Sequence, residues 1–126
     1  MTETGRASTT VLIIDDEPLV LRYLRVLLEM DGHTVYEAMT GPIGLGLIPA
    51  VNPDVVVLDV MMPGMDGLET CSRISAEHPG LPVVILTARD DRELEDRCLA
   101  NGASKFLTKP LRPGQLEEVV ALMASS

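Results

Sequence analysis

Residues 55–62 read Val-Val-Val-Leu-Asp-Val-Met-Met, an apolar run of strand length that carries one carboxylate, Asp59, and leads into a Pro-Gly turn. A short apolar run bounded by turn residues is typical of a strand buried on both faces of a parallel sheet. A lone carboxylate in such a strand is unfavourable, because burial penalises its charged form. The run therefore predicts a central strand, and it predicts that neighbouring groups compensate for the charge of Asp59.

Strand-like runs alternate with helical patterns along the rest of the chain. We expect strands over residues 10–15, 33–37, 54–59, 82–87 and 104–108, and helices over residues 19–30, 66–76, 91–100 and 114–124. In the first helix the expected apolar face comprises Val20, Leu24, Leu27 and Leu28. Strands that alternate with helices predict an α/β fold with a parallel sheet.

The polarity of the strands predicts their order in the sheet. The first, third and fourth strands are continuous apolar runs, whereas the second and fifth carry polar side chains such as Glu37 and Lys105 and therefore belong at the edges. Right-handed crossovers then favour a flavodoxin-like, doubly wound sheet of five parallel strands in the order 2-1-3-4-5, with helices on both faces. Ligands of such sheets bind at the carboxyl ends of the strands, where the chain reverses direction between the first and third strands.

Residues 40–49 fit the expected alternation poorly, because they contain three glycines and two prolines. Topology requires a helix here, with Pro42 in its first turn and Pro49 ending it. Gly44 and Gly46 should each destabilise that helix by about 0.5–1 kcal/mol relative to alanine. We therefore expect a short, weak helix that is the most mobile element of the face distant from the predicted site.

The composition limits the classes of protein to consider. The 126 residues fit one domain, expected over residues 10–124, after a disordered lead-in over residues 1–9 and with no output domain in this chain. A net charge of −9 argues against nucleic acid or an anionic membrane as a direct partner. Cys71 and Cys98 form no CxxC pair and are expected to be free thiols in a reducing cytoplasm.

Three carboxylates follow the two strands at the predicted switch point. Asp15 and Asp16 end the first strand and Asp59 ends the third. An acidic residue before a helix often serves only as its N-cap, but that explains one acid at this place and not an adjacent pair with a third nearby. Oxygen ligands suit Mg²⁺ or Mn²⁺. We expect Asp16 and Asp59 to be direct ligands, Asp15 to bind directly or through water, and the backbone carbonyl of Met61 to complete the protein's share.

Two further polar residues lie at the same ends of later strands. Thr87 ends the fourth strand, and Lys109 follows the fifth, directly before Pro110 in a bond that is a candidate for the cis form. A lysine is usually a surface residue. With a metal already balancing the three carboxylates, an ammonium at this place is explained if a further anion binds there. A phosphoryl group would be such an anion, with Lys109, Thr87 and the metal on its oxygens and Asp59 as the attacking carboxylate.

The chain resembles the receiver domain of two-component response regulators over nearly its whole length. The motifs that carry the resemblance are VLIIDDEP at residues 11–18, VVVLDVMMPGMDG at 55–67, VVILTA at 83–88 and NGASKFLTKP at 101–110. The resemblance implies that Asp59 is the phosphoacceptor and that Asp15 and Asp16 hold Mg²⁺. It also implies that Thr87 and Lys109 contact the phosphoryl group.

The resemblance also implies roles for three residues around this site. Phe106 occupies the position of the family's switch aromatic, which moves inward when Thr87 is drawn to the phosphate; ordinary core packing is the simpler interpretation of an aromatic residue in a strand. Met61 and Arg89 occupy positions that vary in the family and tune the lifetime of the phosphate. Arg89 would either shield the acyl phosphate or bind an attacking water, and the sequence does not distinguish these two roles.

On this resemblance the chain is a cytoplasmic signalling switch and not a turnover enzyme. A sensor histidine kinase or a phosphotransfer protein would phosphorylate Asp59, and an output protein of unknown identity would bind the switched form. Residues 113–118 lack the basic positions that often support dimers of DNA-binding regulators, which favours a monomer or a weak dimer.

Three alternatives belong to other functional classes. A receiver that acts as an adaptor without phosphorylation would keep the fold but not respond to beryllofluoride. An aspartyl-phosphate phosphatase of the haloacid dehalogenase type usually has its nucleophile on the first strand and a second aspartate two residues later, whereas here the acids are adjacent. A flavodoxin-like nucleotide binder needs a phosphate-binding loop after the first strand, where residues 15–18 are Asp-Asp-Glu-Pro and would repel phosphate.

Overall fold

Five strands and five helices alternate along the chain in the computed structural model, which describes residues 9–60, 67–89 and 91–124. Their bounds are β1 (Thr10–Ile14), α1 (Pro18–Met30), β2 (Thr34–Ala38), α2 (Gly41–Val51), β3 (Val55–Leu58), α3 (Gly67–Glu77), β4 (Val83–Thr87), α4 (Arg92–Ala100), β5 (Lys105–Thr108) and α5 (Gln115–Ala124). Each predicted element is present, with ends that differ by one or two residues. The predicted lead-in over residues 1–9 lies, apart from Thr9, outside the described residues.

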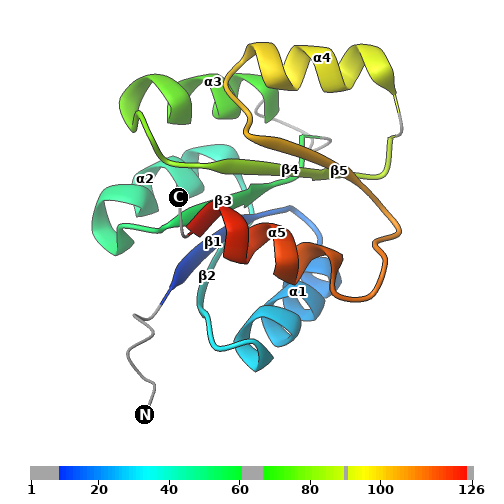
Figure 1. Ribbon diagram of the computed structural model, residues 1–126. Coiled ribbons are helices and arrows are strands. Elements are labelled where there is room, and N and C mark those ends of the chain that lie inside the picture. Colours follow the sequence, from blue (N-terminus) through cyan, green and yellow to red (C-terminus); the bar gives the residue numbers. More distant parts are fainter. Residues whose placement is uncertain (1–8, 61–66, 90, 125–126) are drawn as a thin grey trace.

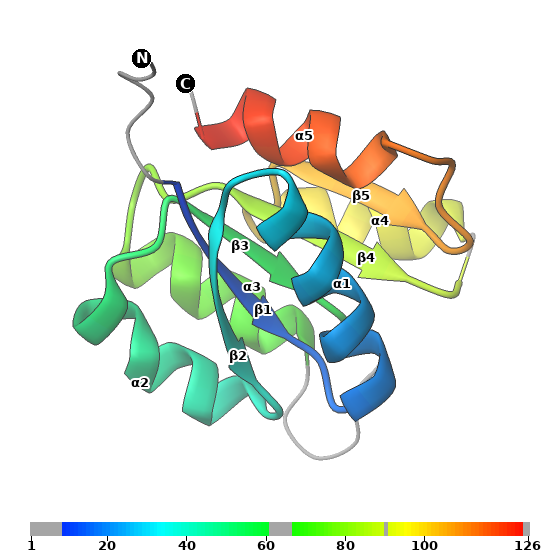
Figure 2. The ribbon, with the colours of Figure 1, turned by 90° about the horizontal axis from the view of Figure 1, so that it is seen from below.

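The strands form one parallel sheet in the order β2-β1-β3-β4-β5, which confirms the predicted α/β fold. Figure 2 shows the arrows of the strands running in the same general direction. Ile14 pairs with Leu58 in the register between β1 and β3, so the residues that follow these two strands emerge side by side. The same parallel arrangement brings the ends of β4 and β5 to that edge, where Thr87 pairs with Thr108.

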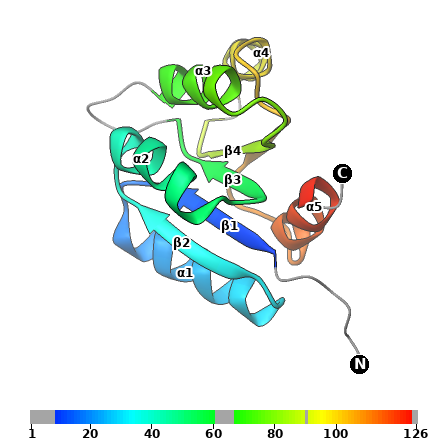
Figure 3. The same ribbon diagram turned by 90° about the vertical axis from the view of Figure 1, so that its left-hand side faces the viewer.

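Helices cover both faces of the sheet, with α1 and α5 on one face and α2, α3 and α4 on the other (Figures 1 and 3). The alternating side chains of the strands divide between two hydrophobic clusters. Leu12, Ile14, Val56 and Leu58 face the layer of three helices. The residues between them along the same strands, such as Ile13 and Val57, face α1 and α5. The central strands are therefore buried on both sides, as their continuous apolar sequence predicts.

The buried face of α1 is rotated from the one expected. Leu21, Leu24 and Leu28 are fully buried against the sheet, whereas Val20 and Leu27 are only half-buried. Leu21 completes a spacing of three and four residues, which is the spacing of a helix face that packs on a sheet. The expected face shares Leu24 and Leu28 with the buried one, and packing against the sheet adds Leu21 in place of Val20 and Leu27.

The helix α2 is longer than the sequence suggested. It begins after Thr40, whose hydroxyl accepts the backbone N–H of Ile43, and it continues through Pro49 to Val51. The expectation that Pro49 ends the helix is therefore wrong. A proline in the last turn removes one backbone donor but leaves the rest of the turn intact, and the stop comes at Asn52, in the left-handed conformation.

Close packing explains one of the unusual glycines in α2. A Cβ atom at Gly44 would lie 2.4 Å from Cδ1 of Ile14, so only glycine lets the helix approach β1 this closely. A Cβ at Gly46 would meet no atom within 4 Å. The two glycines look alike in the sequence, but only Gly44 is required by close packing against β1.

Candidate functional site

Three carboxylates meet at the carboxyl ends of β1 and β3. One carboxylate oxygen from each of Asp15, Asp16 and Asp59 lies within 4.8 Å of the others. Asp15 is 2% exposed and Asp59 is 7% exposed. Their positions are fixed by the sheet, since the backbone N–H of Asp59 donates to the carbonyl of Ile14 (3.0 Å) and that of Asp15 donates to the carbonyl of Ala38 (3.0 Å). The predicted convergence of these acids is present in the structure.

The surroundings of Asp15 make ionisation of its carboxyl group less favourable than in water. Burial raises the pKa of its carboxyl group, and the negative charge of Asp59 acts in the same direction. The backbone N–H of Glu17, which donates to Oδ1 at 2.9 Å, and the charge of Lys109 oppose this effect. A cluster of carboxylates that disfavours its own charge is the kind of site that a cation stabilises.

Lys109 reaches the same cluster from β5. Its Nζ lies 3.8 Å from Oδ2 of Asp15 and 4.0 Å from Oδ2 of Asp59. The backbone N–H of Lys109 donates to the carbonyl of Thr87 (2.8 Å), and its bond to Pro110 is cis. One ammonium therefore faces two buried carboxylates.

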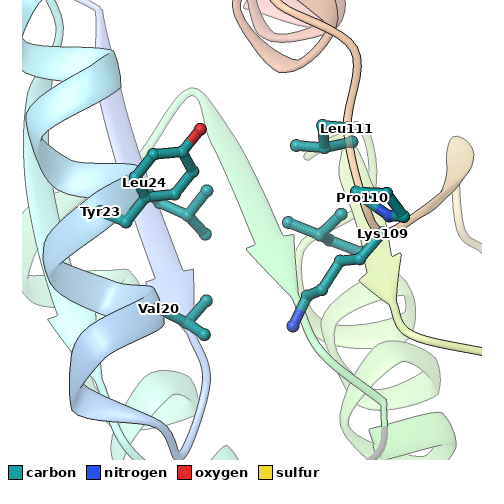
Figure 4. Close-up of a pocket in the computed structure, with 7 residues that line it drawn as sticks. Val20, Tyr23, Leu24, Lys109, Pro110 and Leu111 are labelled. Carbon is teal, nitrogen blue, oxygen red and sulfur yellow. The ribbon is translucent and has the colours of Figure 1, made fainter.

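The side chain of Lys109 lines an apolar cavity between α1 and the segment after β5 (Figure 4). The cavity has a volume of about 230 Å³ and is lined by Val20, Tyr23, Leu24, Leu86, Lys109, Pro110 and Leu111. A long side chain that packs its methylenes on apolar neighbours keeps its charged end directed outward from them. The methylenes of Lys109 therefore border this apolar cavity, while its ammonium lies near the carboxylates of Asp15 and Asp59.

Thr87 and Arg89 stand at the end of β4. Thr87 is fully buried, and its hydroxyl oxygen accepts the backbone N–H of Arg89 at 3.3 Å. The guanidinium of Arg89 pairs with the carboxylate of Asp91, which also caps α4. The sequence placed Thr87 and Arg89 at this edge, but it did not predict the ion pair, because a spacing of two residues in a loop has no fixed geometry.

The other predicted site residues lie in different surroundings. Phe106 is half-buried and packs on the cluster beneath α2, α3 and α4, in agreement with the interpretation as a core residue. Met61, the expected carbonyl ligand and tuning residue, lies outside the described residues. Cys71 and Cys98 are buried free thiols, as expected.

Gly67 is a residue whose importance the sequence did not reveal. A Cβ atom there would lie 2.3 Å from Cα of Val60, the residue after Asp59. The start of α3 therefore approaches the backbone beside the candidate nucleophile more closely than any other residue type permits. No local signal identifies such a contact, because it depends on how α3 packs against the end of β3.

The donor set suits a hard divalent cation. Carboxylate oxygens close together, with one of them half-exposed, offer the ligands and the access to water that Mg²⁺ prefers. Within the described part of the chain, Asp15, Asp16 and Asp59 are the one such group of His, Cys, Asp or Glu residues. In the same part of the chain, none of the helices is both long enough and apolar enough to cross a membrane.

Comparison with known proteins identifies relatives of this chain. Residues 11–121 match the family model described as response regulator receiver domain. The chain is 41% identical over 113 residues to the probable transcriptional regulatory protein TcrX of Mycobacterium tuberculosis, covering 88% of this chain and 46% of that protein. It is 42% identical over 113 residues to the response regulator MprA of Mycolicibacterium vanbaalenii, covering 90% and 48%. The chain thus spans about half the length of the curated relatives it matches.

A solved structure has the same fold. The BeF3-activated N-terminal receiver domain of RstA from Klebsiella pneumoniae superposes with a TM-score of 0.89 at 27% identity, over 94% of this chain and all (100%) of that chain.

Proposed function

Because the chain belongs to the response regulator receiver domain family, we propose that it accepts a phosphoryl group on Asp59 in a Mg²⁺-dependent reaction and thereby changes its affinity for a partner. The observation that carries this proposal is the cluster of Asp15, Asp16 and Asp59 with the ammonium of Lys109 at 3.8 and 4.0 Å from two of the carboxylates. A single carboxylate would not need both a cation site and a lysine, whereas an incoming phosphoryl anion would.

Each residue has a defined part in the proposed transfer. A carboxylate oxygen of Asp59 attacks the phosphorus atom, the bond from phosphorus to the donor's histidine nitrogen breaks, and the freed imidazole takes up a proton. Lys109 neutralises one phosphoryl oxygen and the Thr87 hydroxyl donates to another. Asp15, Asp16 and Asp59 would hold Mg²⁺, joined by the backbone carbonyl of Met61. When bound, the metal supplies positive charge that offsets the charge of the phosphoryl oxygens.

We propose that the phosphodonor is a sensor histidine kinase or a phosphotransfer protein, and that the acyl phosphate is a signal and not an intermediate of turnover. The family of the chain and the name of its relative MprA, a response regulator, support this. The buried free thiols of Cys71 and Cys98 support a reducing compartment, the cytoplasm. Movement of Thr87 toward the phosphate would change the packing of Phe106, whose half-exposed side chain would then report the switch to a partner.

Intact-mass spectrometry tests the proposal. A small acyl phosphate with Mg²⁺ should add one phosphoryl group to the wild-type chain, and a chelator should prevent this. Asp59→Asn should abolish the addition, whereas Asp96→Asn, which removes an exposed carboxylate on α4, should not. Phosphorylation that survives in Asp59→Asn would refute the assignment of the acceptor.

A further inference from the structure

A continuous set of contacts links the end of β4 to the start of α4. The backbone N–H of Arg89 donates to Oγ1 of Thr87 at 3.3 Å, and the guanidinium of Arg89 donates to Oδ2 of Asp91. The other oxygen of Asp91, Oδ1, accepts the backbone N–H groups of Glu93 (2.9 Å) and Leu94 (3.2 Å). One carboxylate therefore holds an arginine with one oxygen and the first turn of a helix with the other.

The capping contacts fix the carboxylate of Asp91 in place. It lies at the N-terminal end of α4, where free backbone N–H groups and the helix dipole favour an anion. The pKa of Asp91 is lowered, first by the hydrogen bond from the N–H of Leu94 and then by the hydrogen bond from Arg89. Arg89 thus faces a permanent and well-oriented negative partner at neutral pH.

Arg89 borders the candidate site through its backbone, and its side chain is exposed to solvent. Its backbone is one hydrogen bond away from the Thr87 hydroxyl, while its side chain is 53% exposed. A phosphoryl group on Asp59 would place a second anion, with several acceptor oxygens, within the same edge of the sheet. The guanidinium would then have two competing partners.

We propose that Asp91 is a positioning residue that keeps the guanidinium of Arg89 away from the Asp59 phosphoryl group and thereby shortens the lifetime of the acyl phosphate. This inference rests on the proposed function. Arg89, once released from Asp91, would pair with phosphoryl oxygens and cover the phosphorus atom from water. In the hydrolysis that it would slow, a water oxygen bonds to phosphorus, the bond between phosphorus and the Asp59 oxygen breaks, and inorganic phosphate and a proton are released.

The size of the effect follows from the exposure of the pair. The side chains of Arg89 and Asp91 are 53% and 28% exposed, and ion pairs in such surroundings are weak. Removing the competing carboxylate should therefore change the lifetime of the phosphate by about two- to fivefold and not by orders of magnitude.

The test measures the rate at which the phosphorylated chain loses phosphate, with Mg²⁺ present and phosphodonor removed. Asp91→Asn keeps a side-chain oxygen for the helix cap and removes the charge, so it should lengthen the lifetime by about two- to fivefold. Asp91→Ser, another capping residue without charge, should do the same. Glu93→Gln is the matched control, since it removes one negative charge from the same turn, and it should leave the lifetime unchanged.

A second substitution shows whether the effect acts through Arg89. Arg89→Gln alone should change the lifetime by less than about twofold, because Asp91 already withholds the guanidinium. Combined with Asp91→Asn, it should remove the gain, as expected for two coupled residues. Helix content measured by circular dichroism should match the wild type in Asp91→Asn, which separates loss of the ion pair from loss of the cap.

Several outcomes would overturn the inference. An unchanged or shorter lifetime in Asp91→Asn contradicts it, and so does a gain that persists in the Arg89→Gln background. If the wild-type chain accepts no phosphoryl group at all, the proposed function fails together with this inference. If the wild-type chain is phosphorylated but the Asp91 and Arg89 variants do not show the expected lifetimes, the inference fails and the proposed function stands.

Discussion

Asp59 is a buried carboxylate whose neighbours, two acids and a lysine, form a site for a cation and an anion. Its backbone is bound to β1, its side chain lies near two other acids, and Lys109 stands 4.0 Å away. Without a cation, the three carboxylates carry more negative charge than one ammonium neutralises. The arrangement is therefore suited to binding and chemistry at some expense of stability, a trade that is common at functional sites.

Neutralising Asp59 should stabilise the metal-free chain. Asp59 faces two carboxylates within 4.8 Å and one ammonium at 4.0 Å, so one like-charge interaction remains unbalanced. In Asp59→Asn we therefore expect the free energy of unfolding to rise by about 1 kcal/mol, the size of one such interaction in water. Urea denaturation in the presence of a chelator measures this, with Asp96→Asn as the control. Addition of Mg²⁺ should stabilise the wild type more than the variant, since ligand binding to the folded state adds to its stability. A variant less stable than the wild type under chelation would contradict the account.

Cys71 gives the stability a dependence on alkaline pH. Burial raises the pKa of its thiol to about 11 from an ordinary value of 9.0, with nearby Cys98 adding to the effect. The folded chain thus keeps a proton that the unfolded chain loses, so stability is full below about pH 9 and declines toward about pH 11. Denaturation curves across this window should decline less steeply in Cys71→Ala. Parallel declines in the two proteins would show that another group is responsible.

The helix α2 shows how far element-level reasoning from sequence can go. Alternation of strands and helices predicted its presence, although its residues favour a helix poorly. Its length could not be predicted, because the effect of Pro49 depends on how many backbone bonds follow it, and the stop is set by the conformation of Asn52. Nor could the role of Gly44 be predicted, since it depends on a contact with Ile14 thirty positions away in the sequence.

The two glycines of α2 should respond to the same substitution in opposite directions. Gly44→Ala places a Cβ 2.4 Å from Ile14 and should destabilise the fold by about 1–3 kcal/mol, as overpacking does. Gly46→Ala meets open space and should stabilise it by about 0.5–1 kcal/mol through helix propensity. Thermal and urea denaturation of the pair tests this. Changes of the same sign would mean that α2 lies differently against β1.

That α2 is the most mobile element of the face distant from the site stays a prediction. Amide hydrogen exchange measures it directly, with α1 as the internal reference. Exchange in residues 41–51 should be faster than in residues 18–30. Equal protection in the two helices would show that packing against β1 outweighs the weak helix propensity of the glycines.

At the scale of the whole molecule, the order of the strands and the meeting of the site residues were predictable from the sequence. Continuous apolar runs indicated the central strands, and the right-handed connection rule then placed the ends of β1 and β3 together. Contacts that rely on side-chain conformation in loops were not predictable. The pair of Arg89 and Asp91 is of this kind. The close approach of Gly67 to Val60 was not predictable either, because it depends on how α3 packs against the end of β3.

The location of the phosphoryl group tests the central claim most directly. The chain is phosphorylated with a small acyl phosphate and Mg²⁺, reduced with borohydride to convert the acyl phosphate to an alcohol, digested, and mapped by peptide mass spectrometry. We predict that the reduced residue is Asp59 and that omission of Mg²⁺ prevents its formation. Modification of Asp15, Asp16 or any other residue in place of Asp59, or of Asp59 to the same extent without a divalent cation, would contradict the account.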